Sequence, residues 1–169
     1  MEKKTIKIAI IYYSKGNNTK LVAETIKIGL EEIENIEVKS MSLEELDPNY
    51  IKEAKAIIFG TPTYYANISW QMKKWFDESQ GYNLEGKLGA VFATENHIGG
   101  GADTALLTLI NHLMVKGMLI YSGGSALGNP YIHLGVVAIK DGDDYQKERA
   151  KIFGNRIARK TLELFGNIK

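Results

Sequence analysis

The chain has 169 residues, of which 44% are hydrophobic and 24% are charged, with 21 lysines and arginines against 20 aspartates and glutamates. This composition predicts one folded domain over residues 1–169. The net charge of +1 lacks the basic excess of a nucleic-acid-binding protein. The absence of cysteine excludes disulfides, thiolate metal sites and a cysteine nucleophile. No apolar run approaches the roughly 20 residues that span a bilayer and no signal-peptide core is present, so we expect a cytoplasmic protein.

Strand-like apolar runs alternate along the chain with segments of helical periodicity. Residues 5–13 form a run too continuously apolar for a half-solvated strand, which predicts a buried parallel strand. Further strands are predicted at residues 36–41, 56–60 and 88–94, and in two pieces at 118–121 and 134–139. Helices are predicted from the Asn17 turn to about residue 34, at residues 69–78, 102–116 and 144–165, with a short helix and a loop over 43–53.

Alternating strands and helices place helices on both faces of a parallel sheet. We therefore predict an α/β fold with three layers and a doubly wound parallel sheet of five strands. In such a sheet, ligands bind beyond the carboxyl ends of the strands, at the point where the strand order reverses. Loops with unusual residues follow the first, third and fourth predicted strands, and they are the candidate site.

The first loop, residues 14–19, joins a buried strand to a helix N-terminus. Its small and turn-forming residues suit the binding of an anion such as phosphate, although an ordinary capped turn has the same residues. The second loop, residues 61–67, contains Tyr64 and Tyr65, which are costly to leave exposed and can line a flat apolar ligand, pack on the surface or fill a subunit contact. The third loop, residues 94–101, ends in three glycines that allow a close approach of backbone to ligand.

The histidines and tryptophans have less distinctive positions. His97 in the third loop is a candidate for ligand contact, and His133 is a second, whereas His112 lies in a predicted helix and is expected to be structural. Trp70 and Trp75 have helical spacing, which favours packing in the core or at an interface over ligand stacking.

Several familiar catalytic apparatuses are missing. The first strand is not followed by Gly-x-Gly-x-x-Gly, and the chain has no Walker P-loop and no Gly-x-Ser-x-Gly elbow. No cluster of histidines and carboxylates has metal-site spacing, so no metal is predicted. A bound redox cofactor would explain a site with few reactive side chains, because the cofactor carries the chemistry.

A family resemblance rests on specific motifs. Residues 60–67 read Gly-Thr-Pro-Thr-Tyr-Tyr-Ala-Asn and are followed by Gln71-Met72-Lys73, with Glu85-Gly86-Lys87, Val91-Phe92 and Gly99-Gly100-Gly101 further on. Nearly the whole chain resembles the flavodoxin-like FMN proteins, and most closely the tryptophan-repressor-binding-protein family of NAD(P)H:quinone oxidoreductases and its small flavodoxin-named relatives. The resemblance implies a flavodoxin-like fold with strand order 2-1-3-4-5 and noncovalently bound FMN.

The resemblance also implies a set of cofactor-binding residues. Around the phosphate it places Ser14, Lys15, Gly16, Asn17, Asn18 and Thr19; on one side of the isoalloxazine ring Pro62, Thr63, Tyr64, Tyr65, Ala66 and Asn67; and on the other side Thr94, Glu95, Asn96, His97, Gly99, Gly100 and Gly101. A carboxylate of Glu95 turned towards the flavin would make its potential more negative, and Lys15 or Lys116 would do the reverse.

Two functional hypotheses follow. In the first, an oxidoreductase takes hydride from NAD(P)H on FMN and passes electrons to a quinone-like acceptor. In the alternative, a flavodoxin-type electron carrier docks to redox partner proteins. The net charge favours the enzyme, because carriers of this kind are strongly acidic. Against it, the chain has Val115-Lys116 where the quinone reductases have a histidine pair. The resemblance further suggests a homodimer or homotetramer.

Overall fold

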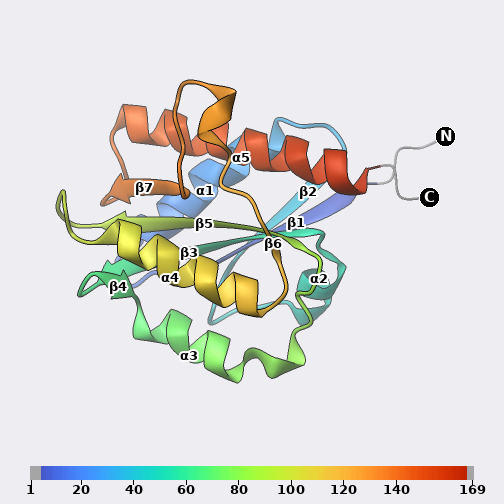
Figure 1. Cartoon of the computed structure of the whole chain (residues 1–169), viewed down its shortest axis with the longest axis horizontal. Coiled ribbons are helices and arrows are strands. Elements are labelled where there is room, and N and C mark those ends of the chain that lie inside the picture. Colours follow the sequence, from blue (N-terminus) through green and yellow to red (C-terminus); the bar gives the residue numbers. More distant parts are fainter. Residues whose placement is uncertain (1–4, 167–169) are drawn as a thin grey trace.

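The computed structural model describes residues 5–166, and in it a mixed sheet separates two layers of helices (Figure 1). The strands run in the spatial order β2-β1-β3-β5-β6, and β4 pairs with β3 while β7 pairs with β5. Their bounds are β1 (Ile6–Tyr12), β2 (Ile36–Ser42), β3 (Ala56–Tyr64), β4 (Asn67–Ile68), β5 (Leu88–Glu95), β6 (Leu119–Ile120) and β7 (Val136–Ile139). The antiparallel β3–β4 pair is the exception in a sheet that is otherwise parallel.

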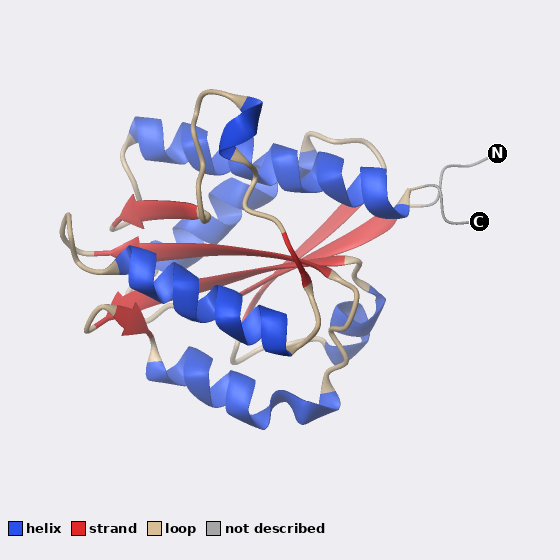
Figure 2. Ribbon diagram, viewed as in Figure 1, coloured by secondary structure: helices blue, strands red, loops and turns tan. Residues whose placement is uncertain are grey.

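The helices cover both faces of the sheet, as Figure 2 shows. They are α1 (Asn18–Glu31), α2 (Pro48–Glu53), α3 (Trp70–Glu78), α4 (Ala102–Val115) and α5 (Asp144–Phe165), with two 3₁₀ turns at η1 (Ser79–Gly81) and η2 (Ser125–Leu127). The α1 and α5 helices pack on one face, and α2, α3 and α4 contribute to the core on the other. The predicted three-layer, doubly wound α/β fold is confirmed. None of the helices within residues 5–166 is long and apolar enough to cross a membrane.

The strands of the sheet centre are buried on both faces, as their continuous apolar runs predict. Along β1, Ile8 and Ile10 pack towards α1 and α5, while Ala9 and Ile11 pack towards the opposite helices. Each of these side chains is completely buried, and burying one isoleucine contributes about 1.5–3 kcal/mol. The sheet centre therefore supplies a rigid base for the loops at its carboxyl edge.

The α1 and α5 helices approach closely enough for their backbones to touch. A Cβ atom on Gly29 would lie 1.9 Å from the carbonyl oxygen of Lys151, and one on Gly154 would lie 2.2 Å from that of Ile26. Glycine is required at both positions because any side chain would separate the two helices.

The third strand is longer than the sequence predicts. We expected a loop over residues 61–67, but β3 continues through Pro62 to Tyr64 and turns back into β4. Pro62 still pairs in register with Thr94 of β5. The turn at Tyr65 and Ala66 has φ angles of 47° and 58°, which glycine and asparagine usually adopt in two-residue hairpins. Because neither residue is one of these, the hairpin could not be predicted from the residues of its turn.

The fifth predicted strand is interrupted. Both predicted pieces pair with β5, as β6 and β7, and residues 121–135 form an insertion between them. The Arg156 guanidinium on α5 holds this insertion. It donates hydrogen bonds of 3.0–3.4 Å to the carbonyl oxygens of Gly123, Gly124, Gly128, Asn129 and Pro130.

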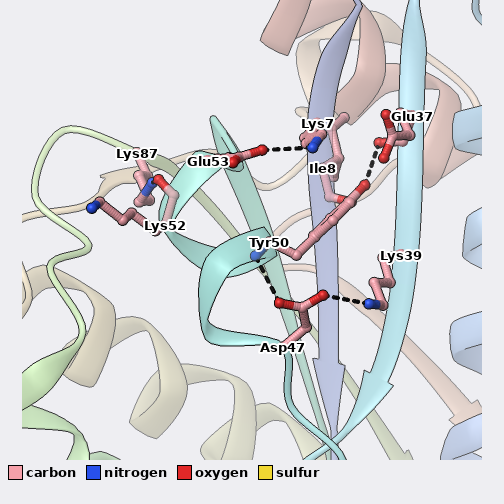
Figure 3. Close-up of polar contacts among 9 residues, drawn as sticks. All are labelled: Lys7, Ile8, Glu37, Lys39, Asp47, Tyr50, Lys52, Glu53 and Lys87. Carbon is pink, nitrogen blue, oxygen red and sulfur yellow. Dashed lines mark hydrogen bonds and ion pairs between the residues drawn. The ribbon is translucent and has the colours of Figure 1, made fainter.

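The Tyr50 side chain of α2 bonds to the backbone of the β1 and β2 strands (Figure 3). Its hydroxyl donates to the backbone carbonyl of Glu37 at 2.9 Å and approaches that of Ile8 at 3.4 Å. The ammonium groups of Lys7 and Lys39 lie 5.3 and 5.5 Å from the centre of its ring. Burial raises the pKa of the Tyr50 hydroxyl well above its usual value, so it remains a neutral donor.

Replacing Tyr50 by phenylalanine should lower the free energy of unfolding by about 1 kcal/mol, the usual net value of one buried hydrogen bond. Urea denaturation measures the change. The control is Tyr145→Phe, since Tyr145 lies exposed on α5 and should lose nothing measurable. Equal stability of both variants would contradict this role for the Tyr50 hydroxyl.

Candidate functional site

The carboxyl ends of β1, β3 and β5 surround a cleft of about 570 Å³. Its lining residues come from all three predicted loops: Ser14, Lys15, Gly16, Asn18, Thr19, Pro62, Thr63, Tyr64, Thr94, Glu95 and Asn96. The cleft lies where the strand order reverses between β1 and β3, which is the place expected for a ligand in an open parallel sheet.

One end of the cleft is formed by the N-terminus of α1. Asn17 has a left-handed backbone, with φ of 67°, and its side chain makes no capping hydrogen bond. The Ser14 hydroxyl accepts a hydrogen bond from the amide of Lys20 at 3.2 Å, which folds the loop back over the first turn of the helix. Hydroxyls, the Lys15 ammonium and the amides at the start of α1 together form a site suited to phosphate.

A buried pair of hydroxyls joins the first loop to the third. The Oγ1 atoms of Thr19 and Thr94 lie 2.8 Å apart, and both residues are almost completely buried. This bond ties the start of α1 to the end of β5 across the sheet. Thr94 therefore fixes the orientation of the Thr19 hydroxyl in the phosphate end of the cleft.

The middle wall of the cleft is the end of β3. The Thr61 hydroxyl, which sequence reasoning did not single out, donates to the Pro62 carbonyl at 2.8 Å and accepts from the Ser69 amide at 3.0 Å. Thr63 Oγ1 is buried and has no hydrogen-bond partner, so it can bond to a ligand. Burial raises the pKa of Tyr64, which keeps its hydroxyl neutral.

The Glu95 carboxylate holds the third loop against the N-terminus of α4. Glu95 Oε2 accepts a hydrogen bond from the Ala102 amide at 3.2 Å, at the N-terminus of α4, where Gly101 offers no side-chain cap. A negative charge is favourable there because of the helix dipole. A Cβ on Gly101 would lie 2.4 Å from Ala66, so glycine also lets the hairpin turn rest against this loop.

Other predicted site residues lie outside the cleft lining. Tyr65 is fully exposed at the hairpin tip, Asn67 is exposed in β4, and His97 lies in the exposed part of the third loop. His133 is exposed in the 121–135 insertion. The remaining ones support or flank the loops: Asn17, Ala66, Gly99, Gly100 and Gly101. The lining of the cleft offers backbone, hydroxyl and charged groups but no histidine.

The structure places the helical His112 and the two tryptophans in different surroundings. His112 bonds through Nδ1 to the Thr108 carbonyl at 2.7 Å and lies 4.8 Å from the Phe76 ring, which is a structural position as predicted. Trp75 packs 5.4 Å from the Phe59 ring in the core. Trp70 is 65% exposed, so of the two expected positions, core and interface, the core is excluded for this residue.

Comparison with known proteins identifies the family. The flavodoxin family profile matches residues 10–151, and the chain belongs to this family. It is 57% identical to a flavodoxin of Clostridium saccharobutylicum, covering 95% of this chain and all of that protein. It is 30% identical to the quinone-oxidoreductase QR2 of Triphysaria versicolor, over 82% of this chain and 78% of that one.

Solved structures agree on the fold. A flavodoxin from the domain Archaea matches with a TM-score of 0.75 and 27% identity, covering 92% of this chain and 99% of the other. A WrbA-like flavodoxin from Agrobacterium tumefaciens matches with a TM-score of 0.77 and 24% identity, covering 94% and 99%. The chain is nearly twice as similar to the clostridial flavodoxin as to QR2, so a special closeness to the quinone oxidoreductases is not supported.

The chain is therefore an FMN-binding redox protein of the flavodoxin family, and it holds the cofactor noncovalently. The groups that line the cleft fit FMN independently of these comparisons. The α1 end offers a phosphate site, and the β3 wall offers the unpartnered Thr63 hydroxyl. FMN supplies the electron-transfer chemistry, and the side chains around it bind and orient the cofactor.

Replacing Thr94 by valine should weaken FMN binding about fivefold, since it removes one buried hydrogen bond that positions Thr19. The serine variant should restore wild-type affinity because it keeps the hydroxyl. Quenching of FMN fluorescence on titration with protein without cofactor measures both constants. The control is Thr25→Val, whose hydroxyl bonds to the Leu21 carbonyl within α1. Wild-type affinity of Thr94→Val would contradict the positioning role.

Proposed function

We propose that this protein is a flavodoxin-type electron carrier, which takes electrons on FMN from one partner protein and delivers them to another. The observation that carries the proposal is its 57% identity, over the full length of the relative, to a protein named flavodoxin. That similarity favours the carrier over the oxidoreductase that the net charge suggested.

The arrangement of the chain's own groups supports a carrier. Ser14, Thr19 and the N-terminus of α1 would hold the phosphate, and the bond from Thr94 keeps Thr19 in place. Thr63 and Tyr64 line the cleft and would offer the ring system a hydrogen-bonding group and an apolar wall. A carrier needs no residue that activates a second substrate, and these side chains would serve to bind and orient the cofactor.

The position of the missing histidine pair gives further support. Val115 is 88% exposed, and the Lys116 ammonium donates to the Ser79 carbonyl at 2.9 Å. Both lie at the C-terminal end of α4, about 20 Å along the helix from the end that adjoins the cleft. Neither side chain reaches the cleft within the same chain.

The surface beside the cleft can receive a partner protein. Tyr65 is fully exposed at the hairpin tip, and Ile98 is 87% exposed in the third loop. Apolar side chains left in water next to a functional cleft are typical of protein contacts. Apolar docking at this edge explains how a carrier with a net charge of +1 binds partners without the strong acidic field of other carriers.

A second candidate, an NAD(P)H-dependent quinone-type oxidoreductase, is favoured by the similarity to QR2. Under this alternative, NAD(P)H reduces the FMN-loaded protein directly.

Anaerobic absorbance of the FMN-loaded protein separates the two candidates. NADH or NADPH alone should bleach the flavin band at least about a hundredfold more slowly than NADPH with a catalytic amount of a flavodoxin reductase, because direct hydride transfer needs a nicotinamide site. A known quinone reductase serves as the positive control. Bleaching by NAD(P)H alone at the rate of that control would overturn the carrier proposal.

A further inference from the structure

A second hollow, of about 660 Å³, is lined by residues of the β3–β4 hairpin, α3 and α4. Figure 1 shows these elements next to one another. We name this hollow the aromatic groove. Its lining residues are Thr63, Tyr64, Tyr65, Asn67, Ile68, Trp70, Lys73 and Thr108. The groove and the cleft share Thr63 and Tyr64, so the end of β3 separates the two.

The aromatic side chains of the groove are displayed to water and are not packed in the core. Trp70 is 65% exposed and Tyr65 is fully exposed, while Ile68 is buried at the base of the hairpin. Trp75 of the same helix shows the contrast, since it packs against Phe59 in the core. Exposed rings around a hollow of this size favour a flat ring system that can stack on them.

The hairpin turn holds the Tyr65 ring outwards, in a backbone conformation that costs free energy. Tyr65 and Ala66 both have positive φ angles, which bulky residues rarely adopt. An Asn-Gly pair would make the same turn without strain, yet a tyrosine occupies it. Strain of this kind gathers at functional sites, and here it places a phenol ring at the mouth of the groove.

The charged side chains that line the groove indicate whether its ligand is an anion or a cation. Lys73 is the charged residue among those that line the groove, and no carboxylate is among them. Lys73 pairs with Asp77 one turn further along α3, and both side chains are about half exposed, so the ammonium can turn towards a bound anion.

We propose that the aromatic groove is a second ligand site, separate from the FMN cleft, that binds a small planar aromatic anion. One or two fused rings stack against Trp70 and Tyr65, and a carboxylate or sulfonate group lies near Lys73. The proposal goes beyond electron transfer and does not depend on whether the protein is a carrier or an oxidoreductase.

The probe for this site is 2-naphthoate, titrated into FMN-saturated protein so that the cofactor cleft is filled. Amide shifts in ¹⁵N NMR spectra should centre on Asn67, Ile68 and Thr108. The neutral analogue 2-naphthol and the non-planar anion cyclohexanecarboxylate should both bind more weakly. Shifts confined to the 14–19 or 94–101 loops would place the probe in the cleft and overturn the proposal.

Two neighbouring lysines provide a matched pair of variants. Lys73→Gln and Lys74→Gln each remove one positive charge and one ion pair to the residue four positions on, but Lys74 lies outside the groove. Lys73→Gln should weaken 2-naphthoate binding about threefold, a typical effect for a partly exposed charge, while Lys74→Gln should leave it unchanged. If both variants weaken 2-naphthoate binding equally, Lys73 acts only through the net charge of the protein, and the proposal is contradicted.

Trp70→Ala tests the stacking. Because Trp70 is largely exposed, the variant should fold normally and weaken 2-naphthoate binding about tenfold, in line with aromatic stacking energies. Unchanged binding would overturn the proposal, as would a dimer in sedimentation that buries this face and excludes the probe. Loss of probe binding in a protein that still holds FMN would leave the proposed carrier function intact.

Discussion

The functional site depends on one close contact inside the sheet. Gly60 of β3 pairs in register with Phe92 of β5, and the Phe92 ring occupies the space of a side chain at position 60. A Cβ on Gly60 would lie 1.9 Å from this ring, which is completely buried. Glycine therefore gives the Phe92 ring, the one aromatic ring of β5, room to lie across β3. The carboxyl ends of the two strands can then lie level, with Pro62 opposite Thr94 at the edge of the cleft.

With the strands in this register, hydrogen bonds within the protein hold the loops in place before any ligand binds. The Thr19–Thr94 bond joins the first loop to β5, the Thr61 hydroxyl locks the end of β3, and the Glu95 carboxylate anchors the third loop to α4. Each of these groups satisfies a neighbour within the protein, and they leave the α1 end and Thr63 Oγ1 free for the cofactor. A site ordered in this way loses little conformational freedom on binding FMN.

The layers of the fold and the place of the site could be predicted from the sequence, because buried parallel strands are continuously apolar and ligands bind where strand order reverses. The β3–β4 hairpin could not, since its Tyr65-Ala66 turn lacks the usual asparagine and glycine. Periodicity also could not separate Trp70 from Trp75. Five residues apart on a helix, they point about 140° away from each other, so only the packing of α3 shows which one reaches the core. Net charge is a weak guide to function for a similar reason, since a sum over the chain does not locate the exposed apolar side chains beside the cleft.

The end of β3 has a double role that follows from its length. Had the strand stopped at Gly60, as its composition suggested, a loose loop would lie between the cofactor and α3. Instead Thr63 and Tyr64 form a wall with the cleft on one side and the aromatic groove on the other. A ligand that moves this wall from one side alters the site on the other side, and thermodynamic linkage makes the effect reciprocal. Whatever factor FMN applies to the affinity of the groove, a groove ligand must apply to the affinity for FMN.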